Sequence, residues 1–150
     1  MLSFIDATLS NPKGTALTAD GIKVDQDMFC RDGFSAKGEV RLLGARIGGD
    51  LDFQDASLTN PGRRALYADT LTVEQNMYCR RKFRTDGEVN LSGAHILGSL
   101  EFTKASLINA EGFALTATSL TVDRNMICGK TLAQGRISLV GAHIEGDPQF

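Results

Sequence analysis

Three cysteines are the residues of this chain best suited to chemistry, and they recur at an even spacing, as Cys30, Cys79 and Cys128. Thiols form disulfides or bind metals when two or more of them lie close together. The chain has no Cys-x-x-Cys pair, the spacing typical of zinc and redox sites. The alternative is a set of reduced thiols buried in a hydrophobic core. We favour buried thiols, which also favours a reducing, cytoplasmic compartment.

Histidines and acidic residues also recur. His95 and His143 share a column of the repeat headed by Arg46, and their alanine and isoleucine neighbours indicate that they point to solvent. A column of acidic residues comprises Asp25, Glu74 and Asp123, followed by Asp27, Asn76 and Asn125. Such a column could bind a cation or imitate phosphates, but a solvated outer face would have the same composition. Sequence motifs of hydrolases, zinc proteases and nucleotide-binding proteins are absent. We therefore predict no catalytic residue, no cofactor and no metal site.

Cations are concentrated in the middle of the chain, in two expected loops. If these loops lie on neighbouring corners of the fold, their side chains form a positive patch suited to an acidic partner. Loop residues are also often basic for solubility alone. The candidate partner-binding residues are Arg63, Arg64, Arg80, Arg81, Lys82 and Arg84.

The elements that must position these residues come from a three-fold internal repeat. Leu2-Ser-Phe-Ile-Asp-Ala-Thr-Leu9 returns as Leu51-Asp-Phe-Gln-Asp-Ala-Ser-Leu58 and as Leu100-Glu-Phe-Thr-Lys-Ala-Ser-Leu107, in steps of 49 residues. A second block, Gly38-Glu-Val-Arg-Leu-Leu-Gly-Ala-Arg-Ile47, returns from Gly87 and from Gly135, the third copy having lost one residue before Gly135. We divide the chain into units 1–49, 50–98 and 99–150 of a single domain.

Within each unit the apolar residues come in pairs separated by one polar residue, such as Val40/Leu42 and Leu51/Phe53. A period of two indicates short strands with one buried face, and starts five or six residues apart indicate a corner after each strand. Two longer gaps per unit predict loops, one with turn residues, such as Ser10–Gly14, and one whose Phe34, Phe83 or Leu132 folds inward. This gives about two four-sided coils per unit, six in all, and a rod of roughly 29 Å at ~4.8 Å per coil. A three-sided coil remains an alternative. Cysteines two coils apart would be separated by ~10 Å, beyond disulfide reach.

The pairs at five-residue spacing, best seen in Ala45-Arg-Ile47, Leu51-Asp-Phe53 and Ala56-Ser-Leu58, resemble the pentapeptide-repeat family. This resemblance implies an all-β, right-handed parallel β-helix with a quadrilateral cross-section. The longer block Gly-Glu-Val-Arg-Leu-Leu-Gly-Ala-Arg-Ile-Gly-Gly also resembles a repeat of large bacterial proteins labelled as membrane-associated oxidoreductases. No redox motif of this sequence supports an oxidoreductase activity.

The net charge of the chain and the exposed edges of its terminal coils limit the functions that we expect. With 16 Lys and Arg against 18 Asp and Glu, a net charge of -2 gives no reason to expect nucleic acid or an anionic membrane as a partner, and no apolar run is long enough to span a membrane. Exposed coil edges predict end-to-end self-association or a place within a longer solenoid, with Pro148 blunting the last edge. The leading hypothesis is a non-enzymatic structural or protein-binding module. The alternatives are a DNA mimic acting on a topoisomerase and a fragment of an oxidoreductase-labelled protein.

Overall fold

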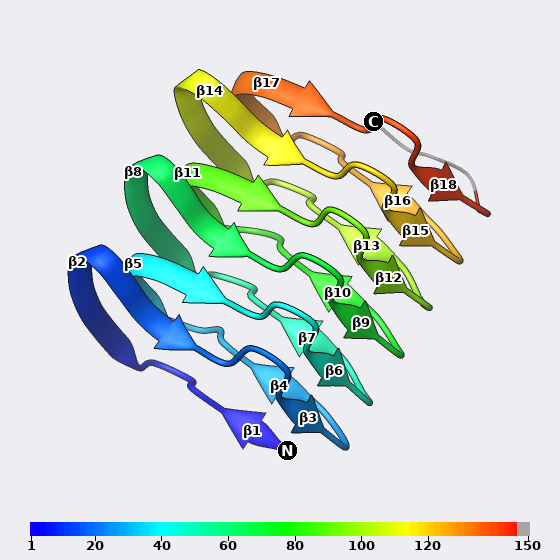
Figure 1. Ribbon diagram of the computed structural model, residues 1–150, viewed down its shortest axis with the longest axis horizontal. Helices are drawn as coiled ribbons and strands as arrows, with labels where there is room; N and C mark the ends of the chain where they lie inside the picture. Colours follow the sequence, from blue (N-terminus) through cyan, green and yellow to red (C-terminus); the bar gives the residue numbers. More distant parts are fainter. Residues whose placement is uncertain (147–150) are drawn as a thin grey trace.

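The chain forms a parallel β-solenoid, described by a computed structural model over residues 1–146. Six successive coils each add one strand to each of three six-stranded parallel sheets (Figure 1). The first sheet contains β1 (Leu2–Ser3), β4 (Met28–Phe29), β7 (Leu51–Asp52), β10 (Met77–Tyr78), β13 (Leu100–Glu101) and β16 (Met126–Ile127). The second contains β2 (Thr8–Thr18), β5 (Ser35–Arg41), β8 (Ser57–Tyr67), β11 (Arg84–Asn90), β14 (Ser106–Thr116) and β17 (Leu132–Ser138). The third contains β3 (Lys23–Val24), β6 (Arg46–Ile47), β9 (Thr72–Val73), β12 (His95–Ile96), β15 (Thr121–Val122) and β18 (His143–Ile144).

This architecture confirms the all-β solenoid of six coils that the alternating apolar pairs predict. Every second residue of a strand enters a single core, as in Val40, Leu42 and Ile47, which are fully buried. Equivalent residues stack directly, since Leu2 pairs with Met28 and Met28 pairs with Leu51. Parallel pairing of each coil with the next satisfies the backbone of the inner coils without any helix.

The second sheet alternates long and short strands. β2, β8 and β14 have 11 residues each, whereas β5, β11 and β17 have seven. The register therefore shifts: Ser10 pairs with Lys37 and Thr15 with Glu39, so residues 11–14 lie opposite one residue. The extra residues arch outward as the three loops seen on one side of the solenoid in Figure 1. These are the turn-rich loops that the sequence predicts.

A glycine lies beneath the neck of each loop. Gly87 has a φ of +128°, and a Cβ at this position would lie 2.6 Å from the carbonyl oxygen of Asn60 and 2.8 Å from that of Arg63. The amide of Asn60 also donates to the carbonyl of Arg64 at 2.7 Å, which closes the neck. Only glycine has both the backbone freedom and the absence of a side chain that this site requires. The other two loops repeat the arrangement with Asn11 over Gly38 and Asn109 over Gly135.

The second longer gap folds inward as predicted in two copies of three. Phe34 and Phe83 are buried, and Phe83 lies 6.0 Å from the ring of Phe53. The prediction for Leu132 is wrong, because Leu132 is 52% exposed. The missing residue of the third copy shortens the turn rather than the strand, so Leu132 pairs with the outward Ser106 and Thr131 takes the inward position.

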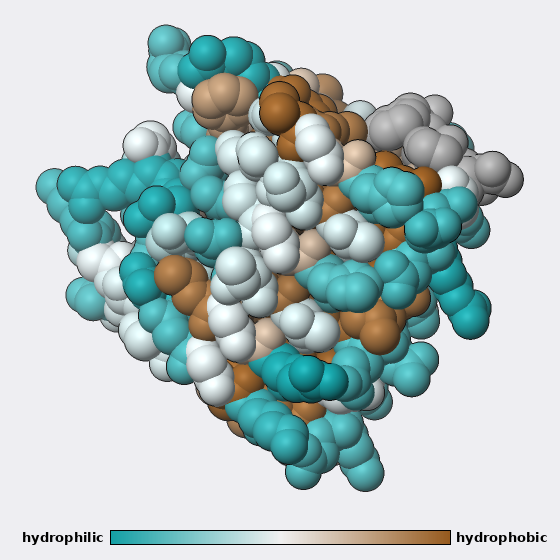
Figure 2. Space-filling model, turned by 45° about the vertical axis from the view of Figure 1, so that its right-hand side comes forward, coloured by the Kyte–Doolittle hydropathy of each residue, from teal (hydrophilic) through white to brown (hydrophobic). Residues whose placement is uncertain are grey.

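The last coil leaves core positions open. Ile137 continues a column of inward side chains through Val89 and Leu115, yet it is 51% exposed. Figure 2 shows hydrophobic residues at this end of the solenoid. The predicted blunting of the edge by Pro148 lies outside the described residues.

Candidate binding groove

The predicted cations fall into two groups on the solenoid surface. Arg63 and Arg64 belong to the loop of β8, whereas the other four lie in the turn after β10 and at the start of β11. Arg64 bonds to Glu39 at 3.2 Å and its guanidinium stacks on the ring of Tyr67 at 3.7 Å. Arg63 has no carboxylate within 4.0 Å among the described residues, so its charge remains available.

The second group is partly neutralised. Arg80 donates to Glu101 at 2.8 Å and lies over the ring of Tyr78 at 4.2 Å, and Arg84 pairs with Asp86 at 3.1 Å. Arg81 and Lys82 are exposed and form no ion pair with residues 1–146. Of the six cations, Arg64, Arg80 and Arg84 therefore have carboxylate partners, whereas Arg63, Arg81 and Lys82 form no ion pair within residues 1–146.

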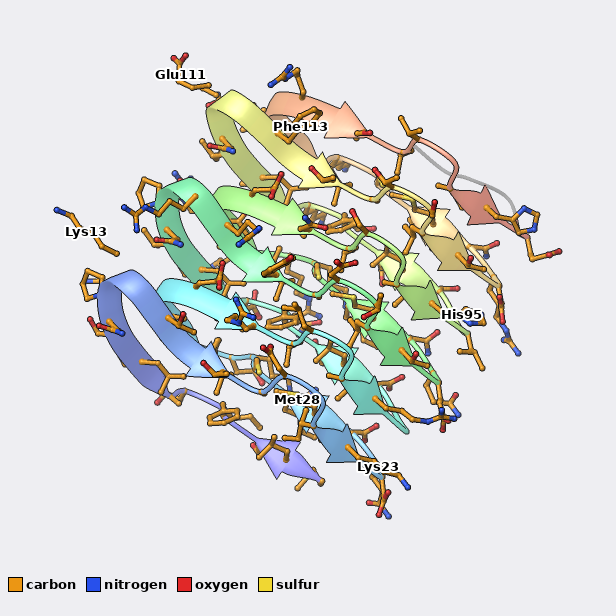
Figure 3. All side chains as sticks on the ribbon, viewed as in Figure 1. Lys13, Lys23, Met28, His95, Glu111 and Phe113 are labelled. Atoms are coloured by element: carbon orange, nitrogen blue, oxygen red, sulfur yellow. The ribbon has the colours of Figure 1, made fainter. Side chains whose placement is uncertain are left out.

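A groove of about 570 Å³ runs along the three loops of the second sheet. It crosses all three loops, each of which stands two coils from the next. Figure 3 shows Lys13 and Glu111 at the tips of the first and third loops, on the side opposite Lys23 and His95. The side chains that give the groove its chemistry are Lys13, Glu39, Arg63, Arg64, Glu88 and Phe113.

The groove has two halves, one between the first and second loops and one between the second and third. The halves differ because equivalent positions of the loops hold different residues. The middle loop has Arg63 where the third has Gly112. The Arg63 guanidinium donates to the carbonyl oxygen of Lys13 at 2.8 Å, which ties the first two loops together. Gly112 has no side chain with which to reach the middle loop, and the space between the second and third loops stays open.

The three thiols have low reactivity. Cys30 and Cys79 are fully buried, which confirms the prediction of core thiols, and Phe53 lies between them in the same column. All three cysteines are free. Burial, with a smaller contribution from the charge of Asp52, raises the pKa of Cys30 to about 12 and that of Cys79 well above its usual value. Burial alone raises the pKa of the less deeply placed Cys128 to about 11. A thiol that stays protonated near neutral pH is a poor nucleophile and metal ligand.

The histidine column lies on the surface as predicted, but each ring has a carboxylate partner that the sequence did not reveal. His95 Nε2 lies 2.9 Å from Asp123 and His143 Nε2 lies 2.7 Å from Glu145, while Arg46 pairs with Glu74. An imitation of DNA needs unpaired negative charge, which these contacts reduce. Within residues 1–146 no three histidine, cysteine or acidic side chains could jointly hold a metal ion.

Asp27 and Asn76, which follow the acidic column, link neighbouring coils. Asp27 accepts a hydrogen bond from the backbone N–H of Asp50 at 2.7 Å. Asn76 accepts one from the backbone N–H of Ser99 at 2.9 Å. Each side chain therefore fastens its own turn to the turn of the next coil.

Lys13, Glu39, Glu88 and Phe113 are groove residues that the sequence analysis did not single out. The repeat could have indicated them, because Glu39, Glu88 and Phe113 lie at the paired positions beside the loops and Lys13 lies within the first loop. No helix among residues 1–146 is long and apolar enough to cross a membrane. Comparison of the chain with protein-family models, curated proteins and solved structures found no match.

Proposed function

We propose that this chain is a non-enzymatic β-solenoid module that binds a protein partner in the groove along its three loops. The observation that carries the proposal is the groove itself, which has a volume of about 570 Å³ and is built from loops that interrupt an otherwise regular coil. Loops held on a rigid scaffold are a common location for binding residues. The protonated, buried thiols offer this scaffold no competing chemistry.

The finer architecture belongs to the same proposal. Paired residues of the first sheet lie alternately 26 and 23 positions apart, as in Leu2–Met28–Leu51. This alternation supports a 49-residue unit made of two coils. The bend of the long strands at each loop divides the second sheet into two faces and supports a four-sided coil. We propose that the coil is right-handed, as in the pentapeptide-repeat proteins that the sequence resembles.

An affinity experiment with matched variants tests the binding role. The groove variant is Lys13→Ser/Arg63→Ser, and the control variant, Lys23→Ser/Arg46→Ser, removes the same number of cations from the third sheet on the opposite side. Each protein is immobilised and exposed to lysate of the source cells, and captured proteins are quantified by mass spectrometry. Thermal unfolding of all three proteins checks that the variants remain folded.

We expect at least one protein to be captured by the wild type and the control variant but not by the groove variant. Recovery of the same proteins in the same amounts by all three would contradict a role for the groove.

A further inference from the structure

We propose that the occupant of the groove is an extended protein segment of opposed charges, with an acidic residue opposite Lys13 and Arg63 and a basic residue opposite Glu88. This inference rests on the proposed binding function and adds the chemistry of the partner. It follows from which charges along the groove are already neutralised within the chain and which are not.

The first half of the groove has surplus positive charge. Glu39 lies between the first and second loops, but it already accepts bonds from Arg41 and Arg64, each at 3.2 Å. Lys13 and Arg63 are exposed and have no carboxylate within 4.0 Å among the described residues. An acidic side chain that enters here therefore meets cations whose charge is not already paired, which is the condition for a favourable contact.

The second half contains a carboxylate, that of Glu88, without an ion-pair partner among the described residues. Glu88 lies opposite Arg64 in the strand register, but Arg64 is bonded to Glu39. Glu88 accepts a hydrogen bond from the hydroxyl of Thr116 at 2.8 Å, and within residues 1–146 it forms no ion pair. Its carboxylate is partly buried, so a cation brought to it would be screened less than one on the open surface.

The walls of the second half suit a cation with an apolar stem. Phe113 lines the groove beside Glu88, with the guanidinium of Arg136 over its ring at 4.2 Å. A neighbouring hollow of about 270 Å³ is lined by Pro61, Ile108 and Glu111. Lysine and arginine pack their methylene groups on apolar surface while their charged ends reach a carboxylate. A nucleic acid has no such cation, and its phosphates would be repelled by Glu88.

The dimensions favour a peptide over a small ligand. From the coil of Lys13 to the coil of Phe113 there are four strand spacings, or ~19 Å, the length of about six residues of extended chain. Glu88 lies about two coils beyond the midpoint between Lys13 and Arg63, or ~10 Å, which corresponds to about three residues. The two charges of the partner should therefore be two to four residues apart.

A displayed library of random eight-residue peptides, selected on the purified full chain, tests the inference. We expect enriched peptides to contain Asp or Glu two to four residues from Lys or Arg. A synthetic enriched peptide should bind Glu88→Gln about tenfold more weakly than the wild type, the change expected for one charged hydrogen bond. The same peptide with its basic residue replaced by Glu should bind Glu88→Lys more tightly than it binds the wild type. Asp25→Lys, an exposed change on the opposite side, is the control and should not alter binding.

Enriched peptides of one charge sign, or equal affinity for wild type and Glu88→Gln, would overturn the inference. So would the absence of any enriched peptide. The proposed binding function is refuted separately, by protein capture that Lys13→Ser/Arg63→Ser leaves unchanged. Unfolding temperatures of the Glu88 variants close to that of the wild type exclude loss of the fold as the cause of weaker binding.

Discussion

Substitution of Gly87 by alanine should destabilise the solenoid more than an ordinary surface change, because the methyl group would enter the neck of the middle loop. The added Cβ would lie 2.6 Å and 2.8 Å from the carbonyl oxygens of Asn60 and Arg63. Both oxygens belong to backbone, which the Asn60 amide holds in place through its bond to Arg64. The neck can therefore open only by moving the loop.

The magnitude follows from two contributions. An L-residue with a positive φ costs roughly 1–2 kcal/mol, and forcing a methyl group into a closely packed site costs about 1–3 kcal/mol more. The expected loss for Gly87→Ala is thus about 3 kcal/mol, which corresponds to a fall of about 10 °C in Tm for a chain of this size. Gly62→Ala is the matched control, because Gly62 has a φ of +72° and nothing within 4 Å of its Cβ position. Only the first contribution applies to it, and its Tm should fall by about 4 °C.

Thermal unfolding followed by circular dichroism measures both variants. The reduced freedom of the unfolded chain when alanine replaces glycine affects the two equally, so their difference reports the close approach at the neck together with the larger φ of Gly87. A Gly87→Ala protein as stable as Gly62→Ala would refute the claim that the loop closes over this glycine.

Three further outcomes follow from buried polar groups. Thr85→Val should raise the free energy of unfolding by about 1 kcal/mol, because the Thr85 hydroxyl is buried and has no hydrogen-bond partner within residues 1–146. Thr131→Val, which removes a 2.6 Å bond to a backbone carbonyl, should lower it in the same denaturant titration. Thiol labelling at pH 8 should modify Cys128 first and leave Cys30 and Cys79 unmodified until the protein unfolds, and equal labelling rates would contradict their burial. Stability should also fall as pH rises above 9, since the pKa of Cys30 rises from 9.0 to about 12 on folding and the unfolded state therefore binds fewer protons in this range. Unfolding free energies measured from pH 8 to 11 should decline less steeply for Cys30→Ala, and an unchanged decline would exclude this thiol as a contributor.

The coil could be predicted from the sequence because its determinants are local. Alternation of apolar and polar residues places Val40 and Leu42 on one buried face whatever the rest of the fold does. The 49-residue spacing of the cysteines likewise placed them two coils apart, where the structure inserts Phe53 between Cys30 and Cys79.

Features that depend on contacts between coils could not be predicted in this way. The gap in the third copy can be placed anywhere between Cys128 and Gly135 in the sequence, and only the pairing of Leu132 with Ser106 shows that the turn lost the residue. The role of Asp27 could not be predicted either, because its carboxylate accepts a hydrogen bond from a backbone N–H of the following coil.

The groove could not be predicted because nearness along the chain does not show which charges are paired in the fold. Glu39 and Arg64 are 25 residues apart and yet form an ion pair, while Arg63 and Arg64 are neighbours with different partners. Three of the six predicted cations, Arg64, Arg80 and Arg84, already have carboxylate partners. Which charges remain available is decided across coils, and this can be seen only once the register is known.

The structure separates what folding requires of the loops from what it leaves free. Every loop has an asparagine that closes the neck, and a glycine of the next coil lies beneath it, because the geometry admits little else. The tips are under no such constraint, and there Lys13, Gly62 and Glu111 occupy equivalent positions with different charges. Identical tips would close the coils equally well, so folding does not account for the different charges of the tips. The ligand that we propose, with the complementary order of charges, would account for them.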